Sequence, residues 1–244
     1  MKYLLLITLC IGRITAFAQN DKEFIDQYGR ETSEDKASAY LVKTYNPTDS
    51  NQVEIHQYQL NGALLEKSTY QNFGRKTKIG AWQKWSGDGQ LILDAYFNEK
   101  GNLEGTARSY FEDGRLRRED HFDDGKLVTG KVWDDNGDEI AHYPLLEEVS
   151  FGSEYMDWFR YLGKNVKYPT QARRMGIQGT VMVEFLIQKD GSVSNIEVIN
   201  SPHESLSEET ERVMRLSPKW NPQKIEGEAQ VTLMTIPINF RLAQ

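Results

Sequence analysis

The sequence contains almost no cysteine, since its 244 residues include a single one, Cys10. That count excludes a disulfide-stabilised scaffold and a zinc module built on cysteines. Basic residues are outnumbered, with 29 Lys and Arg against 36 Asp and Glu, and they form no long block. A nucleic-acid-binding protein is therefore excluded, because such proteins present a concentrated positive surface.

Motifs for catalysis and metal binding are also missing. The four histidines are scattered, without a pair at helical spacing. Asp134 begins a stretch like a calcium loop, but Glu139 and Leu145 stand where that loop needs glycine and glutamate. Neither a phosphate-binding glycine loop nor a nucleophile elbow is present. We therefore expect a protein that is not an enzyme, with no catalytic residue, no cofactor and no metal.

Only one apolar run is long, and it lies at residues 3–12. The small residues Ala16 and Ala18 follow it, so the pattern predicts a signal peptide, residues 1–18, cleaved after Ala18. A bilayer-spanning helix needs about 20 apolar residues, which makes the run short for an anchor. Two alternatives stay open: an uncleaved leader that anchors the chain, and a lipid on Cys10, although Leu9 precedes it in place of a small residue.

Residues 37–137 predict an array of antiparallel β-hairpins. Short segments rich in aromatic and β-branched residues alternate there with turn signals. Aligned turn glycines recur at intervals of 27, 25 and 23 residues, at Gly62, Gly89, Gly114 and Gly137. Such periods are typical of stacked repeats, in which neighbouring units cover each other's apolar faces. The aromatic rows could bind a glycan or a lipid, but packing between hairpins is the simpler interpretation.

Two less regular segments flank this array. Residues 19–36 are mostly charged and polar, and we expect them to form a flexible lead-in. Residues 138–150 carry several acidic side chains and Pro144 without periodicity, so we expect a short linker there. A second domain, residues 151–244, follows the linker.

The pattern of the second domain predicts helices packed on a small antiparallel sheet. Together with the hairpin array, this places the chain in the α+β class. We expect the apolar stripe of its first helix to consist of Tyr155, Trp158, Phe159 and Leu162. Ser205 or Ser207 is expected to cap its last helix. The expected elements are helices at 154–165, 170–175 and 205–216 and strands at 179–188, 192–200 and 229–242.

Several motifs of this domain resemble the C-terminal domain of TonB. They are the Tyr-Pro motif that opens residues 168–185, the Asp-Gly turn at 190–193, Pro-x-Trp-x-Pro at 218–222 and Ile-Pro-Ile-x-Phe at 236–240. Their order and spacing are those of the family, over about residues 155–242. The preceding array resembles, over about residues 60–137, the MORN-like repeats of the YwqK antitoxin family, whose units combine a G-x-L turn with strands that carry aromatics.

The TonB resemblance implies a periplasmic domain that binds the TonB-box peptide of an outer-membrane transporter, and it implies that the segment before the Tyr-Pro motif touches the transporter. From the residues themselves, Pro237 predicts that the last strand lies at a sheet edge, because proline cannot donate a ladder hydrogen bond. An exposed edge accepts an added strand. The expected partner-binding residues are Asn165, Lys167, Tyr168, Pro169, Val231, Leu233, Thr235, Pro237 and Asn239.

Other readings of the same features stay open. Tyr168 and Pro169 are equally expected to fix a turn between two helices. The chain also departs from the family pattern, since its seven prolines cannot form the long proline-rich spacer of a force-transmitting TonB. If the leader is cut after Ala18, the protein cannot pull against the inner membrane and is a recognition module without a motor.

Two functional hypotheses follow. The first is a periplasmic TonB-family protein that binds peptides of outer-membrane transporters or other partners by β-strand addition, in TonB-dependent transport across the outer membrane. The second is an envelope scaffold whose hairpin repeats bind protein or glycan, without energy transduction. Two further possibilities stay open. One is an inner-membrane proton-channel complex as a further partner, with an uncleaved leader as inner-membrane anchor. The other is a homodimer.

Overall fold

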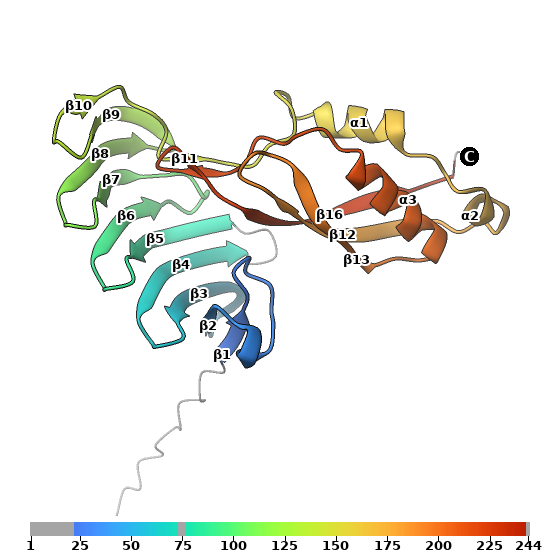
Figure 1. Ribbon diagram of the computed structural model, residues 1–244, viewed down its shortest axis with the longest axis horizontal. Coiled ribbons are helices and arrows are strands. Elements are labelled where there is room, and N and C mark those ends of the chain that lie inside the picture. Colours follow the sequence, from blue (N-terminus) through green and yellow to red (C-terminus); the bar gives the residue numbers. More distant parts are fainter. Residues whose placement is uncertain (1–21, 73–76, 243–244) are drawn as a thin grey trace, which may run out of the picture.

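The computed structural model describes residues 22–72 and 77–242, which form a curved antiparallel sheet and a C-terminal domain of helices on a small sheet (Figure 1). This arrangement confirms the α+β class and the order of the two parts along the chain. The expected signal peptide, residues 1–18, lies outside the described residues. Within the described ranges, no helix has the length and apolar character that a bilayer crossing requires.

The N-terminal sheet is a meander in which each strand pairs with the strand that follows it in sequence, from β1 to β10. A single 3-10 turn, Glu34–Lys36, lies between the first two strands. The strands are β1 Lys22–Ile25, β2 Ala39–Asn46, β3 Asp49–Gln59, β4 Leu64–Asn72, β5 Thr77–Trp85, β6 Leu91–Phe97, β7 Gly105–Tyr110, β8 Leu116–Asp123, β9 Lys126–Trp133 and β10 Glu139–Ile140.

The aligned glycines close the same turn in each repeat. Gly62, Gly89, Gly114 and Gly137 have φ angles of 92°, 91°, 83° and 89°, a region that L-residues with a side chain rarely adopt. In each turn the glycine N–H donates to the carbonyl oxygen three residues earlier, at 2.9–3.0 Å. The repeat seen in the sequence is therefore a repeat of turn geometry.

Alternate residues of the meander form a core on its concave face. Trp82, Leu93, Ala95 and Phe97 are at most 5% exposed and belong to one cluster, whereas Tyr96, between the last two, is 52% exposed. The indole N–H of Trp82 donates to Glu66 at 2.9 Å, which satisfies its polar atom inside the cluster.

The expected flexible lead-in and the expected short linker each contain a strand. Lys22–Ile25 forms β1, which pairs with β2 and places Ile25 in a buried position. In the linker, Leu145 is 1% exposed and packs into the core of the meander, because Leu146–Glu147 forms strand β11 beside the C-terminal domain. Both segments are too short for their periodicity to be visible against their charged residues.

The C-terminal domain carries its helices on one face of a three-stranded sheet of order β13-β12-β16. Apolar residues of all three strands form its core, and the alternate residues Val181, Val183 and Phe185 of β12 are fully buried. The elements are α1 Asp157–Asn165, α2 Thr170–Arg174, β12 Gly179–Ile187, β13 Val193–Asn200, α3 Glu204–Arg215 and β16 Thr232–Phe240.

Two details of the helices differ from expectation. Trp158 and Leu162 of the expected stripe pack against the core, but Tyr155 precedes α1 and is 86% exposed, and Phe159 is 49% exposed. The cap of α3 is His203, whose ring nitrogen accepts the N–H of Ser205 at 3.1 Å. Neither Ser205 nor Ser207 is the capping residue, because the helix begins one residue earlier than its apolar pattern suggests.

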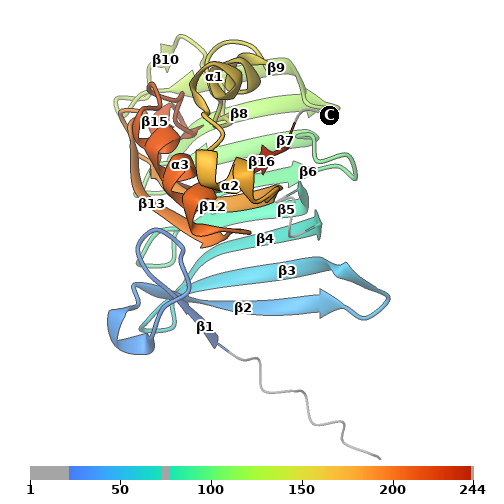
Figure 2. The same ribbon diagram turned by 90° about the vertical axis from the view of Figure 1, so that its right-hand side faces the viewer.

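A small sheet joins the two parts of the molecule. It consists of β11, β14 (Lys224–Ile225) and β15 (Glu228–Ala229), and the turn between the last two strands reaches β8 of the meander. Figure 2 shows the helices of the C-terminal domain in front of the meander sheet. A second contact lies near the first strand, where the Arg30 guanidinium pairs with Glu184 of β12 at 3.0 Å.

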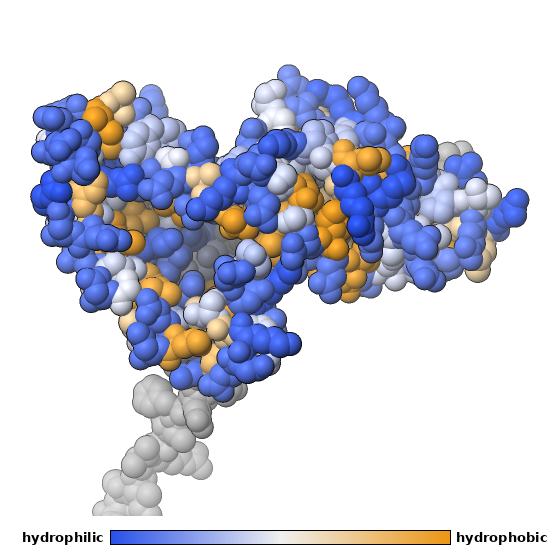
Figure 3. Space-filling view, viewed as in Figure 1, coloured by the Kyte–Doolittle hydropathy of each residue, from blue (hydrophilic) through white to orange (hydrophobic). Residues whose placement is uncertain are grey.

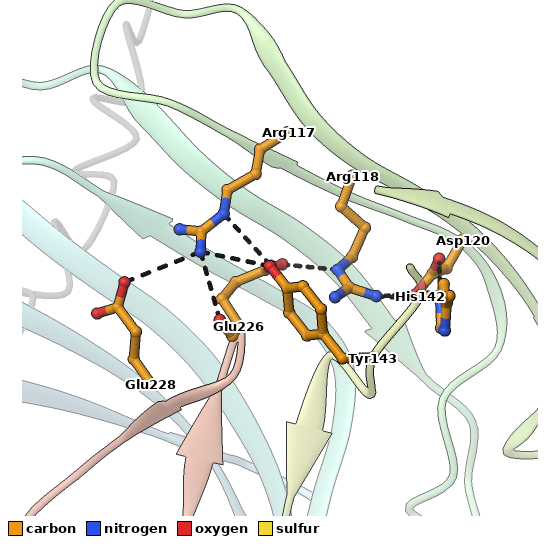
Figure 4. Close-up of polar contacts among 7 residues, drawn as sticks. All are labelled: Arg117, Arg118, Asp120, His142, Tyr143, Glu226 and Glu228. Carbon is orange, nitrogen blue, oxygen red and sulfur yellow. Dashed lines mark hydrogen bonds and ion pairs between the residues drawn. The ribbon is translucent and has the colours of Figure 1, made fainter. Parts of the chain in front are cut away.

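A cluster of polar side chains fixes the first of these contacts, and we call it the junction cluster (Figure 4). Arg118 of β8 is fully buried and donates to Glu226 at 2.9 Å and to Asp120 at 2.6 Å. Burial opposes the Arg118 charge, but the Glu226 and Asp120 carboxylates outweigh it and raise the arginine pKa. The cluster comprises Arg117, Arg118, Asp120, His142, Tyr143, Glu226 and Glu228.

Candidate functional site

Strand β16 lies at the edge of the C-terminal sheet. It pairs with β12 along its whole length, from Ile187–Thr232 to Gly179–Phe240, without a register shift. In the part of the chain that the structure describes, no strand pairs with its other side. The strand therefore carries a row of backbone N–H and C=O groups without a ladder partner.

Pro237 defines which backbone groups point outward. It lies opposite Met182, and a proline fits this register where its nitrogen faces away from the neighbouring strand. Because hydrogen-bonded and non-hydrogen-bonded positions alternate in an antiparallel pair, Leu233, Thr235 and Asn239 share this outward orientation. The expectation of an edge strand from Pro237 agrees with this geometry.

The side chains of β16 follow the same alternation. Ile238 and Phe240 are 2% exposed and belong to the core, whereas Thr235 and Pro237 are exposed on the opposite face. The side-chain oxygen of Asn239 accepts a hydrogen bond from the Thr180 hydroxyl of the neighbouring strand at 2.7 Å. Main-chain groups, more than side chains, are thus what this edge offers to a partner.

The segment between α1 and α2 is held by hydrogen bonds from its own domain. The Asn165 side chain donates to the Tyr161 carbonyl at 2.8 Å, and the Asn165 carbonyl accepts from Arg212 at 2.6 Å. The Lys167 N–H donates to the Glu209 carboxylate, while the Lys167 side chain is exposed. Burial opposes ionisation of Glu209, but hydrogen bonds from Arg212 and Lys167 outweigh it and lower the pKa of this carboxyl.

Tyr168 joins this segment to the end of β16. Its hydroxyl donates to the Ile177 carbonyl, and its ring meets Phe240 edge-on with centroids 5.9 Å apart. Pro169, with φ −61°, is the residue before α2. The structure thus brings Tyr168 beside the edge strand and also gives Tyr168 and Pro169 a role in the turn between the helices.

A groove of about 290 Å³ lies where these elements meet. Leu162 and Gly163 of α1 form one side and Val166 and Tyr168 the adjoining wall. The residues of β16 that line it are Ile238, Asn239 and Phe240. Leu162, Gly163 and Val166 were not among the expected binding residues, although the helical spacing of Leu162 after Trp158 indicated a buried neighbour.

The two remaining expected residues lie at the other end of β16. Val231 lies one residue before β16, where the chain leaves the small joining sheet. Val231 and Leu233 line a cavity that faces the meander. Among the residues that the structure describes, no group of three or more His, Cys, Asp or Glu side chains is placed to hold a metal ion.

Comparisons with known proteins concern this same domain. Residues 164–242 match the family model described as Gram-negative bacterial TonB protein C-terminal. Among solved structures, the chain is similar to the NMR solution structure of the Helicobacter pylori TonB-CTD, with 29% sequence identity, 36% of this chain and 80% of that chain covered, and a TM-score of 0.28. The comparison with curated proteins gives no match. Over residues 164–242, the C-terminal domain is therefore similar to the TonB C-terminal family.

Proposed function

We propose that the protein acts in envelope transport by binding an extended peptide of an outer-membrane transporter, which adds a strand to β16. The observation that carries this proposal is the unpaired edge of β16, with outward backbone groups at Leu233, Thr235 and Asn239. Strand addition obtains its affinity from main-chain hydrogen bonds and its selectivity from neighbouring side-chain pockets. The groove beside Tyr168 supplies such a pocket at one end of the strand.

The meander would hold this domain in a fixed orientation. A proline-rich spacer leaves a recognition domain free to search, whereas here the junction cluster and the Arg30–Glu184 pair attach it to a broad sheet. In this proposal the protein is a periplasmic recognition module, and any force on the transporter is supplied by a partner. Cleavage after Ala18 would leave the module free in the periplasm.

A proline at position 235 tests strand addition directly. Thr235 has the same outward orientation as Pro237, so Thr235→Pro removes one outward N–H without removing a ladder bond to β12. Thr235→Val keeps the N–H and is the matched control. The probe is a displayed library of random peptides long enough to span β16, and the readout is the affinity of the peptides that the unmodified protein enriches.

We expect Thr235→Pro to abolish peptide binding and Thr235→Val to retain it, with both variants folded by circular dichroism. The physical reason is that an added strand loses a hydrogen bond and meets the proline ring. Equal binding by Thr235→Pro and the unmodified protein would show that the peptide does not pair with this edge.

A further inference from the structure

One stretch of the C-terminal domain, residues 158–183, carries five basic side chains and no Asp or Glu, although the whole chain has 29 Lys and Arg against 36 Asp and Glu. The stretch covers most of α1, the whole of α2 and the segment between them. A similar stretch at residues 67–87 differs, because its lysines on β4 and β5 pair with Glu54 and Glu66. Whether such a stretch gives a positive surface thus depends on the partners of its side chains.

Most of the basic side chains in residues 158–183 have no carboxylate partner. Arg160 is the exception, because it pairs with Glu154 and, at 2.6 Å, with Asp157. The two carboxylates at the start of α1 are therefore engaged by Arg160. The other four basic side chains are exposed and form no ion pair within residues 22–72 and 77–242: Lys164, Lys167, Arg173 and Arg174.

Four carboxylates belong to the neighbouring helix α3. Glu209 and Glu211 each pair with an arginine of the same helix at 2.7 Å. Glu204 and Glu208 are exposed and have no ion pair in the part of the chain that the structure describes. Glu197, also exposed, lies on β13 at the sheet edge opposite β16. On the helices, two unpaired carboxylates thus stand against four unpaired basic side chains, so positive charge prevails there.

Large apolar side chains are exposed on the same helix as Lys164. Tyr155, Met156 and Phe159 are 86%, 50% and 49% exposed, and the Tyr155 and Phe159 rings are 5.8 Å apart. Met156, Arg160 and Lys164 recur at every fourth position, so they share one face of the helix. Exposed apolar side chains that lie together on a surface mark contacts with another protein or with a membrane.

These side chains lie at the end of the molecule away from the meander. In Figure 1, α1 runs towards the end of the C-terminal domain where α2 and the last residues of β16 lie. Arg241, directly after β16, is exposed and lines the groove beside Tyr168 together with Gly163 of α1. Figure 3 shows mainly hydrophilic residues over this end, with hydrophobic residues beside them. We call the following residues the outer face: Tyr155, Met156, Phe159, Lys164, Lys167, Arg173 and Arg174.

We propose that the outer face binds the surface of a bilayer that contains anionic phospholipids. Each Lys or Arg near such a surface strengthens binding about fivefold, and aromatic side chains beside them enter the headgroup region. The four basic side chains stand on an open surface, since none of them lines the groove at Tyr168. This arrangement fits the spread charge of a membrane better than the single charge of an acidic side chain.

The rest of the molecule favours one orientation on such a surface. Residues 22–140, which form the meander, carry 16 basic and 22 acidic side chains, so an anionic membrane repels them. A protein bound through the outer face therefore turns the meander away and presents the groove and the end of β16 to the membrane. The inference goes beyond the proposed function and does not depend on strand addition.

The test is co-sedimentation of the purified full protein with two kinds of vesicle, one of phosphatidylcholine mixed with phosphatidylglycerol and one of phosphatidylcholine alone. The charge variant is Lys164→Gln combined with Lys167→Gln. The matched control is Lys126→Gln combined with Lys189→Gln. Both control lysines are exposed, form no ion pair among the described residues and lie elsewhere, on β9 and in the turn after β12. Circular dichroism checks that every variant is folded.

We expect the unmodified protein to sediment with the anionic vesicles and not with phosphatidylcholine alone. The charge variant should bind the anionic vesicles at least about tenfold more weakly, and the control should stay within about twofold of the unmodified protein. Added salt should release the bound protein, because it screens exposed charges. Tyr155→Ser combined with Phe159→Ser should also weaken binding, because the apolar contact with the headgroup region is lost.

Three results would contradict the proposal. Equal binding to both kinds of vesicle would overturn recognition by charge, and an equal loss in the control and the charge variant would overturn its location. Binding of polyglutamate without binding of anionic vesicles would identify an acidic protein as the partner in place of a lipid surface. Thr235→Pro should bind vesicles as the unmodified protein does, so a failure of strand addition and a failure of membrane binding appear in separate assays.

Discussion

Replacing Arg118 with methionine should strongly destabilise the junction between the meander and the C-terminal domain. The guanidinium is fully buried and pairs with Glu226 at 2.9 Å and Asp120 at 2.6 Å. Asp120 keeps a second partner, His142, at 2.9 Å, whereas Glu226 is left with only a 3.3 Å bond from Tyr143 and the loose 3.7 Å pair with Arg117. Removing one partner of a buried ion pair costs about 3–5 kcal/mol.

The assay is urea unfolding of the full protein, followed by intrinsic fluorescence. With a total stability of about 5–15 kcal/mol for a folded domain, this loss should lower the midpoint by about 1–2 M urea. The matched control is Arg108→Met, because Arg108 of β7 pairs with Glu119 of β8 at 2.8 Å, but both of these side chains are more than 40% exposed. An exposed pair contributes about 0–1 kcal/mol.

A second variant separates the lost pairing from a general packing defect. Arg118→Met combined with Glu226→Met removes both charges of the pair that joins β8 to the small joining sheet, and it should recover part of the stability that Arg118→Met loses. Equal midpoints for Arg118→Met and Arg108→Met would refute the reasoning. A double variant that is several kcal/mol less stable than Arg118→Met would also refute it.

Three further predictions concern the C-terminal domain and the leader. Tyr168→Phe should cost about 1 kcal/mol through the lost bond to Ile177 and leave peptide affinity unchanged, whereas Tyr168→Ala should weaken peptide binding, measured by fluorescence anisotropy. If Tyr168→Ala binds the peptide with unaltered affinity, Tyr168 fixes the turn between the helices and does not contribute to peptide binding. Because the folded Glu209 pKa lies below its unfolded value, stability should be present above about pH 4 and fall as the pH drops through the folded pKa, and Glu209→Gln should flatten this slope in acid titrations of unfolding. Mass spectrometry of the native N-terminus should find Gln19, and an intact Met1 in the inner membrane would contradict a cleaved leader.

Local turn chemistry and strand alternation explain which parts of the fold could be predicted. The glycines at 62, 89 and 114 mark turns with positive φ, which few other residues adopt, so their spacing revealed the hairpins. In the C-terminal domain, Val181, Val183 and Phe185 alternate with more polar residues, and this pattern placed β12 with its buried face. Pro237 indicated that the last strand lies at a sheet edge, because a proline has no amide hydrogen to donate to a neighbouring strand.

Features that depend on contacts between distant residues were not visible in the sequence. Arg118 and Glu226 are 108 positions apart, and each alone looks like an ordinary surface charge. Glu66 likewise pairs with Lys78 and Lys84 only because β4 and β5 lie side by side in the folded sheet. Tyr155 and Phe159 had helical spacing but face outward, because Trp158 and Leu162 of the same helix occupy the core.

The central claim, strand addition at β16, is tested most directly by amide hydrogen exchange of the protein with and without a peptide selected from the random library. The outward amides of Leu233, Thr235 and Asn239 should gain protection when the peptide binds, because each can then donate to an added strand. The inward amides of Ile236 and Ile238 already face β12 and should change little. Peptide binding that leaves the three outward amides unprotected would contradict the account.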